Sequence, residues 1–441
     1  MIKGPFSGNG IPVNLNNEDS NIFKDPYYEL LVKTCKSNNL FTNSRQDTKK
    51  LQQSLVYPYL EYFIRNDKNN YYKKLLYNRG LAKDTNGNLK DNLKLVDLVK
   101  LRIHSDDLRG DGQKDRLINS ECKGMEFMSS GTTAGTNGPV KVFRSNASLS
   151  LSRTTNGNLI DWSLGKKVNE GDTLFHMAPE MTNFLAFAAI GSDFLRHRGL
   201  SVKFGAKVNK GPQNSTIWQR LGPNMKEMKS FFKLKSNTKY FIASGVGLYK
   251  MFMEPKGIKK LVMKLALSAP PVFLGKNGVL MMGGGLKRLP SSITSLNQIV
   301  RKTGPKIIAG WNKKDSPAPV IDMLGLTESL NVFIGVPTDP FSNDPWVKYP
   351  HPLTYVSLLK SPFDLTPVEH PEPGKEYLLF YLNFMTMDYI EAIVPGDFVL
   401  ASKEVDKINT AMGERNISQS GFIYSRRAEQ NEGFKIREGC G

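Results

Sequence analysis

A run of small and hydroxyl-bearing residues between positions 129 and 141 has the composition of a phosphate-binding loop. It opens with Ser129, Ser130, Gly131, Thr132 and Thr133 and closes on Lys141. Glycines let the backbone turn with positive φ and approach a ligand closely. Successive N–H groups in such a loop form an anion site. The loop therefore predicts binding of a nucleotide polyphosphate. No Lys directly follows its last glycine, so it does not match the G-x-x-x-x-G-K-[ST] pattern, and a plain surface loop is the alternative.

Two acidic residues follow segments that we expect to be strands or turns. The apolar run 320–324 leads into Gly325-Leu326-Thr327-Glu328, and Asp397 follows Pro395-Gly396. An acid directly after a buried strand lies at the carboxyl edge of a sheet, where open α/β sheets bind ligands. Carboxylate oxygens suit Mg²⁺ and also accept hydrogen bonds from sugar hydroxyls. The structural alternatives are a helix cap for Glu328 and a turn closure for Asp397.

The elements that must position these residues change character along the chain. Before about residue 120 the pattern is helical: Asp25-Pro26 is a start signal, and further helical patterns cover 47–65, where Pro58 predicts a kink or break, 71–77 and 93–103. After residue 124, short apolar runs alternate with glycine-rich turns and helical patterns, which is typical of an α/β fold. Helices are expected over 258–265 and from Ser291 to Val300. Strands are expected at 272–274, 279–282, 376–382 and 398–401, and long loops over 336–375.

Composition and charge exclude several classes of protein. Hydrophobic residues make up 39% of the 441 residues, enough for a globular core. No apolar run reaches the roughly 18 residues of a membrane span. Sixty Lys and Arg against 41 Asp and Glu give a net charge of +19, which attracts phosphates, acidic proteins, nucleic acid or acidic lipid, or reflects compositional bias. No zinc, RNP or homeodomain signature accompanies the charge, so we do not expect nucleic acid as a partner.

Three cysteines, Cys35, Cys122 and Cys440, fit neither a disulfide framework nor a metal motif. They indicate a reducing compartment, and with no secretory signal pattern at the N-terminus we expect a cytoplasmic protein without integral membrane contact.

Taken in order, the Ser-Ser-Gly-Thr-Thr loop, Gly-Leu-Thr-Glu, Pro-Gly-Asp and a late Ser-Arg-x-x-Glu resemble the adenylate-forming superfamily of acyl-CoA synthetases, nonribosomal adenylation domains and luciferases. The resemblance covers residues 124–441. It implies an α/β fold, an adenylate-forming N-terminal domain with stacked β-sheets flanked by helices, followed by a reduced C-terminal lobe. The domains it implies are 1–120, a helical N-terminal part of the same large domain; 121–425, the adenylation core; and 426–441, a short C-terminal stub.

The resemblance also implies a role for each motif. Ser129, Ser130, Gly131, Thr132 and Thr133 would hold the ATP phosphates, and Gly283, Gly284 and Gly285 would line the adenine. Thr327 would touch phosphate and Glu328 would hold Mg²⁺. Asp397 would accept the ribose hydroxyls, and Arg426 would bind ribose or phosphate. His176 stands where family members carry an aromatic residue or His near the substrate carboxylate; a buried core His is the alternative.

The sequence departs from the family pattern at several places. Ala134 and Ser425 stand where glycines are usual, and the loop is longer before Lys141, which puts a catalytic role of Lys141 in doubt. The sequence ends soon after Arg426, without the large mobile lobe that carries the family's catalytic Lys. Within the superfamily this shortened end resembles the acyl-protein synthetases, in which an acyl group moves to a cysteine near the C-terminus, the place that Cys440 takes here. An idle thiol is the alternative.

The sequence therefore predicts a ligase that uses ATP and Mg²⁺ to adenylate a carboxylic acid, in particular a fatty acid, and passes the acyl group to a thiol such as Cys440. An acyl reductase would be the onward partner. One alternative is a ligase with an external acceptor: CoA, an acyl carrier protein or an amine. A second is a non-catalytic anion- or nucleic-acid-binding protein on the same scaffold.

Overall fold

The structure is a computed structural model of the 441-residue chain. It describes residues 20–37, 39–109, 112–118, 121–128, 140–168, 170–179, 195, 198–210, 221–233, 238–254, 278–283, 290, 292–293, 296–307, 320–336, 346–410, 412–428 and 432. The expected helix over 258–265 and strand over 272–274 lie outside these residues. No helix within them is long and apolar enough to cross a membrane.

The N-terminal part is helical, as the sequence predicts. Its elements are α1 (Ser20–Phe23), α2 (Pro26–Cys35), α3 (Arg45–Asn66), α4 (Tyr71–Asn78) and the 3₁₀ helices η1 (Leu95–Leu101), η2 (Ser105–Leu108) and η3 (Lys114–Arg116). Asp25 caps α2 by accepting the Tyr27 N–H at 2.8 Å and also pairs with Arg65 of α3. Of the predicted kink or break at Pro58, the break does not occur: α3 continues through Pro58, since its buried face packs into the core on both sides of that residue.

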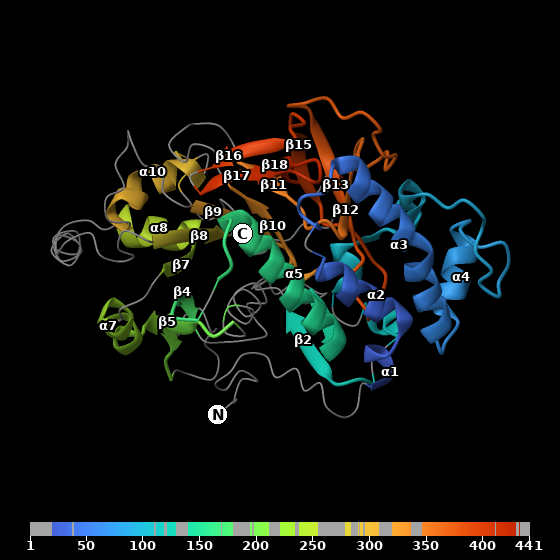
Figure 1. Ribbon diagram of the computed structural model, residues 1–441, viewed down its shortest axis with the longest axis horizontal. Helices are drawn as coiled ribbons and strands as arrows, with labels where there is room; N and C mark the ends of the chain where they lie inside the picture. The colour runs from blue at the N-terminus through green and yellow to red at the C-terminus, as the bar shows by residue number, and fades with distance from the viewer. Residues whose placement is uncertain are drawn as a thin grey trace.

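A 14-stranded sheet forms the centre of the molecule (Figure 1). One section is mostly parallel, in the order β9-β8-β7-β4-β5, with β6 antiparallel at its edge. Its strands are β4 (Thr173–Pro179), β5 (Ser201–Val208), β6 (Leu221–Pro223), β7 (Lys239–Ser244), β8 (Gly278–Gly283) and β9 (Val320–Gly325). Helices α5 (Asn146–Leu164), α7 (Met225–Lys233), α8 (Gly245–Phe252) and α10 (Leu296–Ile307) flank this section. The predicted strands at 279–282 and 320–324 are confirmed; α10 begins five residues after Ser291, later than expected.

The other section of the sheet is mainly antiparallel and continues from β9 through β10. Its strands are β1 (Ile103–His104), β10 (Val332–Gly335), β11 (Val347–Tyr349), β12 (Thr354–Leu359), β13 (Glu376–Asn383), β14 (Glu391–Val394), β15 (Asp397–Ala401) and β18 (Phe422–Arg427). The prediction of long loops over 336–375 is wrong, because β11 and β12 lie there and pair with β10 and β13. Two hairpins, β2 (Gly124–Met128) with β3 (Lys141–Ser145) and β16 (Lys407–Thr410) with β17 (Gly413–Asn416), stand apart.

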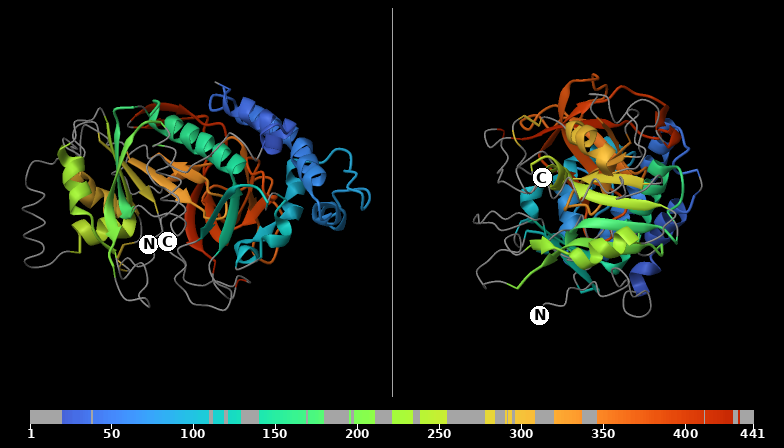
Figure 2. Two further views of the ribbon diagram at one scale, coloured as in Figure 1. Left: turned by 90° about the horizontal axis from the view of Figure 1, so that it is seen from below. Right: turned by 90° about the vertical axis from the view of Figure 1, so that its left-hand side faces the viewer.

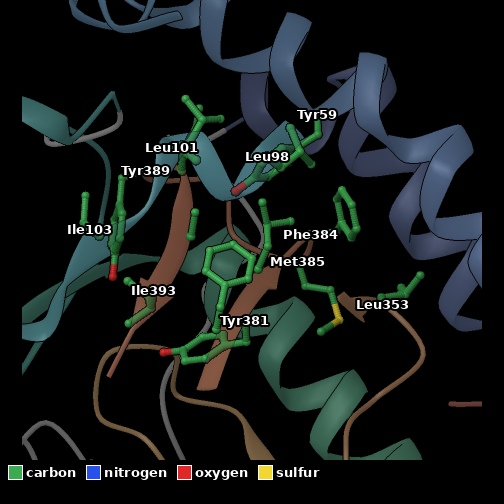
Figure 3. Packing of buried hydrophobic residues seen from close by; sticks show 14 of the residues in the cluster. Tyr59, Leu98, Leu101, Ile103, Leu353, Tyr381, Phe384, Met385, Tyr389 and Ile393 are labelled. Atoms are coloured by element: carbon green, nitrogen blue, oxygen red, sulfur yellow. The ribbon is translucent and has the colours of Figure 1, made fainter. Parts of the chain in front are cut away.

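Three buried clusters hold these layers together. Helix α5 packs on one face of the parallel section through Leu159, Ile160 and Leu164. Helices α8 and α10 pack on the opposite face, with α5 and α10 on different sides in Figure 2. The largest cluster joins the N-terminal helices to β13, β14 and the segment 384–390 between them (Figure 3).

Four tyrosine hydroxyls of the N-terminal part form hydrogen bonds with the segment 384–391. The hydroxyls of Tyr27 and Tyr62 donate to backbone carbonyls of that segment, and those of Tyr59 and Tyr72 accept backbone N–H groups from it, all at 2.6–3.1 Å. Buried polar groups need such partners, so these bonds fix how the segment runs beneath the helices.

Candidate active site

The hairpin β2–β3 carries the predicted phosphate loop. Met128 pairs with Lys141 in register, so these two residues form the base from which residues 129–139 extend. Ser129, Ser130, Gly131, Thr132 and Thr133 themselves lie outside the described residues. Lys141 is partly exposed, with its ammonium 3.9 Å from the Glu126 carboxylate. A surface contact of this kind contributes little to stability. Lys141 therefore lies at the loop base and is held only weakly by Glu126.

Thr327 and Glu328 lie in the turn between β9 and β10, where the sheet changes from parallel to antiparallel. Glu328 is 6% exposed. No described residue donates a hydrogen bond to its carboxylate, while its backbone carbonyl accepts two, from Arg144 at 2.5 Å and Tyr389 at 2.9 Å. Leu330 in the same turn has a left-handed φ of 52°, a costly conformation for a residue with a side chain. A buried acid on a strained turn is typical of a functional site.

Gly283 ends β8, which runs parallel to β9. It pairs with Met323, four residues before Thr327, so Gly283 and Thr327 belong to the same carboxyl edge of the sheet. Gly284 and Gly285 lie outside the described residues. The first glycine of the predicted adenine segment is thus next to the strand that delivers Glu328, which is where an α/β sheet binds ligands.

Asp397 begins β15 and pairs in register with Arg427, the last residue of β18. Asp397 is 2% exposed, and the guanidinium of Arg427 lies 3.4 Å from its carboxylate. The carboxylate of Asp397 raises the pKa of Arg427 against the opposing effect of burial, and Glu328 raises it further. Both predicted site acids therefore act on the charge of Arg427, and Asp397 is the one that contacts it.

Arg426, the arginine that the motif predicted, lies elsewhere. Its guanidinium binds the carboxylates of Glu376 and Glu432 at 2.8–3.0 Å and lies 4.0 Å from the centre of the Phe398 ring. The role of Arg426 stays a prediction, while the arginine that contacts Asp397 is its neighbour. Sequence reasoning missed Arg427, because its contact with Asp397 depends on the register in which β15 and β18 pair.

His176 lies inside β4 and is 5% exposed. Its ring stacks on Phe204 with centroids 6.0 Å apart, and burial lowers its pKa to about 4. His176 is therefore neutral at physiological pH. Of the cysteines, Cys35 is buried with its pKa raised by burial to about 12, and Cys122 is half-buried. Cys440 lies outside the described residues.

The described residues contain no group of three or more His, Cys, Asp or Glu that could by itself hold a metal ion. Mg²⁺ does not need one, because it binds through one or two carboxylates, water and substrate phosphates. Glu328 offers such a carboxylate with no donor of the described protein bound to it. The donor set at this turn thus fits a magnesium–nucleotide complex.

Comparison with known proteins identifies the fold. No protein-family model and no curated protein matches the chain. Among solved structures, 2-hydroxyisobutyryl-CoA ligase in complex with 2-HIB-AMP and CoA, in the thioesterification state, matches with a TM-score of 0.54 at 15% identity, over 88% of this chain and 70% of that one. An open conformation of that ligase with the same ligands matches with a TM-score of 0.53 at 15% identity, over 87% and 76%. The chain therefore shares the fold of this ligase, and the predicted α/β fold with a large sheet flanked by helices is confirmed.

Proposed function

We propose that this chain is an ATP-dependent ligase that adenylates a carboxylic acid and then transfers the acyl group to a thiol. The observation that carries the proposal is the arrangement of three charged residues: Arg427 lies 3.4 Å from the Asp397 carboxylate, and the charge of Glu328 also raises the pKa of Arg427. Strand β3 of the β2–β3 hairpin is bound to the Glu328 turn through the hydrogen bond from Arg144 to the Glu328 carbonyl. The confirmed fold supports the same reading.

Each group has a role in that reaction. Attack of the substrate carboxylate oxygen on the α-phosphorus of ATP forms acyl-AMP and expels pyrophosphate. Glu328 would hold Mg²⁺, which when bound neutralises charge on the phosphates. Asp397 would accept the ribose hydroxyls, and Arg427 would keep that carboxylate ionised in its buried position. Such groups work by fixed electrostatics, since charge moves onto the leaving group.

The acyl acceptor is the open part of the proposal. The thiol of Cys440 is one candidate, as a nucleophile toward the acyl–phosphate anhydride. CoA is the other, and the structurally similar ligase was crystallised with CoA. A fatty acid is the substrate class that the sequence resemblance favours. An acyl carrier protein or a reductase would be the partner that takes the product onward.

Carboxylate-dependent exchange of labelled pyrophosphate into ATP tests the first half-reaction. We expect exchange that requires Mg²⁺ and rises with the right acid from a panel of fatty, hydroxy and aromatic acids. Labelled acid that stays on the denatured protein, and is lost in the C440S variant, would assign the thiol to Cys440. Turnover that requires added CoA would assign it to CoA. Absence of exchange over the whole panel would refute the ligase and favour a non-catalytic nucleotide- or anion-binding protein.

A further inference from the structure

A buried charge network surrounds Arg144 and includes the backbone carbonyl of Glu328. Arg144 lies on β3, three residues after Lys141 at the loop base, and is 1% exposed. Its guanidinium donates to the carboxylate of Glu391 at 2.6 Å, to the hydroxyl of Tyr389 at 3.3 Å and to the carbonyl of Glu328 at 2.5 Å. The Tyr389 ring lies beneath it at 4.8 Å. One side chain thus contacts two separate parts of the chain, the Glu328 turn and the segment 389–391.

The network is anchored from several sides. Glu391 also accepts a hydrogen bond from Asn383 of β13, and its N–H donates to Tyr59 of α3. Next along the chain from Arg144, the Ser145 N–H donates to the carboxylate of Asp388. Burial raises the pKa of Glu391, although Arg144 opposes the rise. Hydrogen bonds in such a dry interior are strong and directional, so Arg144 has a defined position relative to α3 and the sheet.

We propose that Arg144 and Tyr389 are positioning residues that set the distance and orientation between the glycine-rich hairpin and the Glu328 turn. This inference rests on the proposed function for its catalytic meaning. Both side chains donate to the same atom, the carbonyl oxygen of Glu328. Two donors on one carbonyl fix the plane of the peptide that follows Glu328, and with it the direction in which the carboxylate leaves the backbone.

The backbone of this turn is strained, so the bonds from Arg144 and Tyr389 are needed to hold its conformation. The turn contains Leu330 with a left-handed φ of 52°, which persists only where the surroundings impose it. Asn156 of α5 donates to the Leu330 carbonyl at 3.0 Å, and the Ser329 hydroxyl accepts the Asn331 N–H at 3.2 Å. Without the bonds from Arg144 and Tyr389, the first half of the turn can relax toward a lower-energy backbone. The Glu328 carboxylate then loses the direction that the proposed function requires of it.

The test compares two buried tyrosines that differ in what they hold. Tyr389→Phe removes the hydroxyl bonded to Glu328. Tyr27→Phe removes an equally buried hydroxyl that donates to the Phe384 carbonyl at 2.6 Å and makes no bond to the Glu328 turn. Tyr27→Phe deletes one hydrogen bond, and Tyr389→Phe deletes two, because the Tyr389 hydroxyl also accepts a hydrogen bond from Arg144 at 3.3 Å. Both changes keep the ring, so both proteins should fold.

Two readouts are measured on the full chain. We expect Y389F to accelerate hydrogen exchange in the peptide covering 324–332, and to raise the Mg²⁺ concentration for half-maximal pyrophosphate exchange about fivefold, the equivalent of one hydrogen bond. Y27F should leave both at the wild-type values. Arg144→Lys keeps a cation beside Glu391 but loses the planar fork, so where it folds it should exceed the Y389F effect.

The outcomes separate the two claims. Equal exchange rates over 324–332 in Y389F and Y27F would overturn the positioning role, whatever the activity. Faster exchange in Y389F with unchanged Mg²⁺ dependence would overturn the catalytic meaning given to it. If wild-type protein showed no pyrophosphate exchange, the proposed function would fail, and the hydrogen-exchange comparison would still decide whether Arg144 and Tyr389 hold the turn.

Discussion

The Glu328 carboxylate is buried, yet no described residue donates a hydrogen bond to it, while the backbone of the same residue is held by two donors. A buried charge without a bonded partner costs stability. We therefore expect Glu328→Gln to leave the melting temperature unchanged or higher, and to lower pyrophosphate exchange on the order of 100-fold, as for loss of one electrostatic catalytic group. Thermal melts and exchange assays on the same preparations check this. A large loss of stability without a selective loss of exchange would make Glu328 a structural residue.

The neighbouring arginines of β18 give a second comparison at the residue scale. Arg427 contacts Asp397, whereas Arg426 binds Glu376 and Glu432. We expect Arg427→Met to raise KM for ATP about tenfold, since it removes a charged contact at Asp397, the acid that we propose binds the ribose. We expect Arg426→Met to change KM less than twofold. Steady-state exchange at varied ATP distinguishes them. The reverse order would return the nucleotide-binding role to Arg426, as the motif predicts.

At the scale of elements, the motifs predicted the strands and turns that carry the candidate site residues. They did not predict on which face of a strand each side chain lies. The strands at 320–324 and 376–382 could be predicted because nearly every residue in them is apolar. Which of Arg426 and Arg427 contacts Asp397 could not be predicted. The pairing of β15 with β18 shifts register between Phe398 and Val399, and an extra residue in one strand re-aims the side chains that follow. Register is a property of the assembled sheet.

A second element-scale feature crosses three strands. The ammonium of Lys348 on β11 reaches over Gly335 on β10 to the carboxylate of Asp322 on β9, and both charged groups are buried. Burial lowers the pKa of Lys348 to about 7. A Cβ on Gly335 would stand 3.0 Å from the Val347 carbonyl oxygen, and 3.3 Å from Cδ and 3.5 Å from Nζ of Lys348. The missing side chain of Gly335 therefore leaves room both for the backbone of β11 and for the ion pair.

We expect Gly335→Ala to push Lys348 off Asp322 and to lower the free energy of unfolding by about 3 kcal/mol, the cost of disturbing a buried ion pair. Urea denaturation measures the change. In a background that carries Asp322→Asn with Lys348→Met, the same substitution should cost at least 1 kcal/mol less, since no pair remains to be broken. Equal costs in the two backgrounds would show that Gly335 serves only backbone packing.

At the scale of the whole molecule, the hydroxyls of the N-terminal tyrosines are bonded to residues 384–391, and this segment in turn bonds Arg144 and Glu328. The N-terminal helices, which the motifs place outside the site, are thus linked to it through two layers of hydrogen bonds. Sequence patterns predicted those helices from their periodicity. They gave no sign of this link, because the partners are more than 300 residues apart in the chain.

The pH dependence of global stability follows from the interior of the sheet. His176 has its pKa lowered by burial from 6.5 to about 4. Between these two pH values the unfolded chain binds a proton at His176 and the folded chain does not. The free energy of unfolding therefore falls as the pH drops from about 6.5 to about 4, and His176 causes no further change below about pH 4. Over this pH range the free energy of unfolding falls by about 3 kcal/mol because of His176. We expect His176→Phe to remove that part of the acid sensitivity, measured as the difference in unfolding free energy between pH 7 and pH 5. If the unfolding free energy of the variant fell as steeply as that of the wild type, we would conclude that His176 gains a proton in the folded protein. A histidine beside a substrate-binding position open to water behaves in this way.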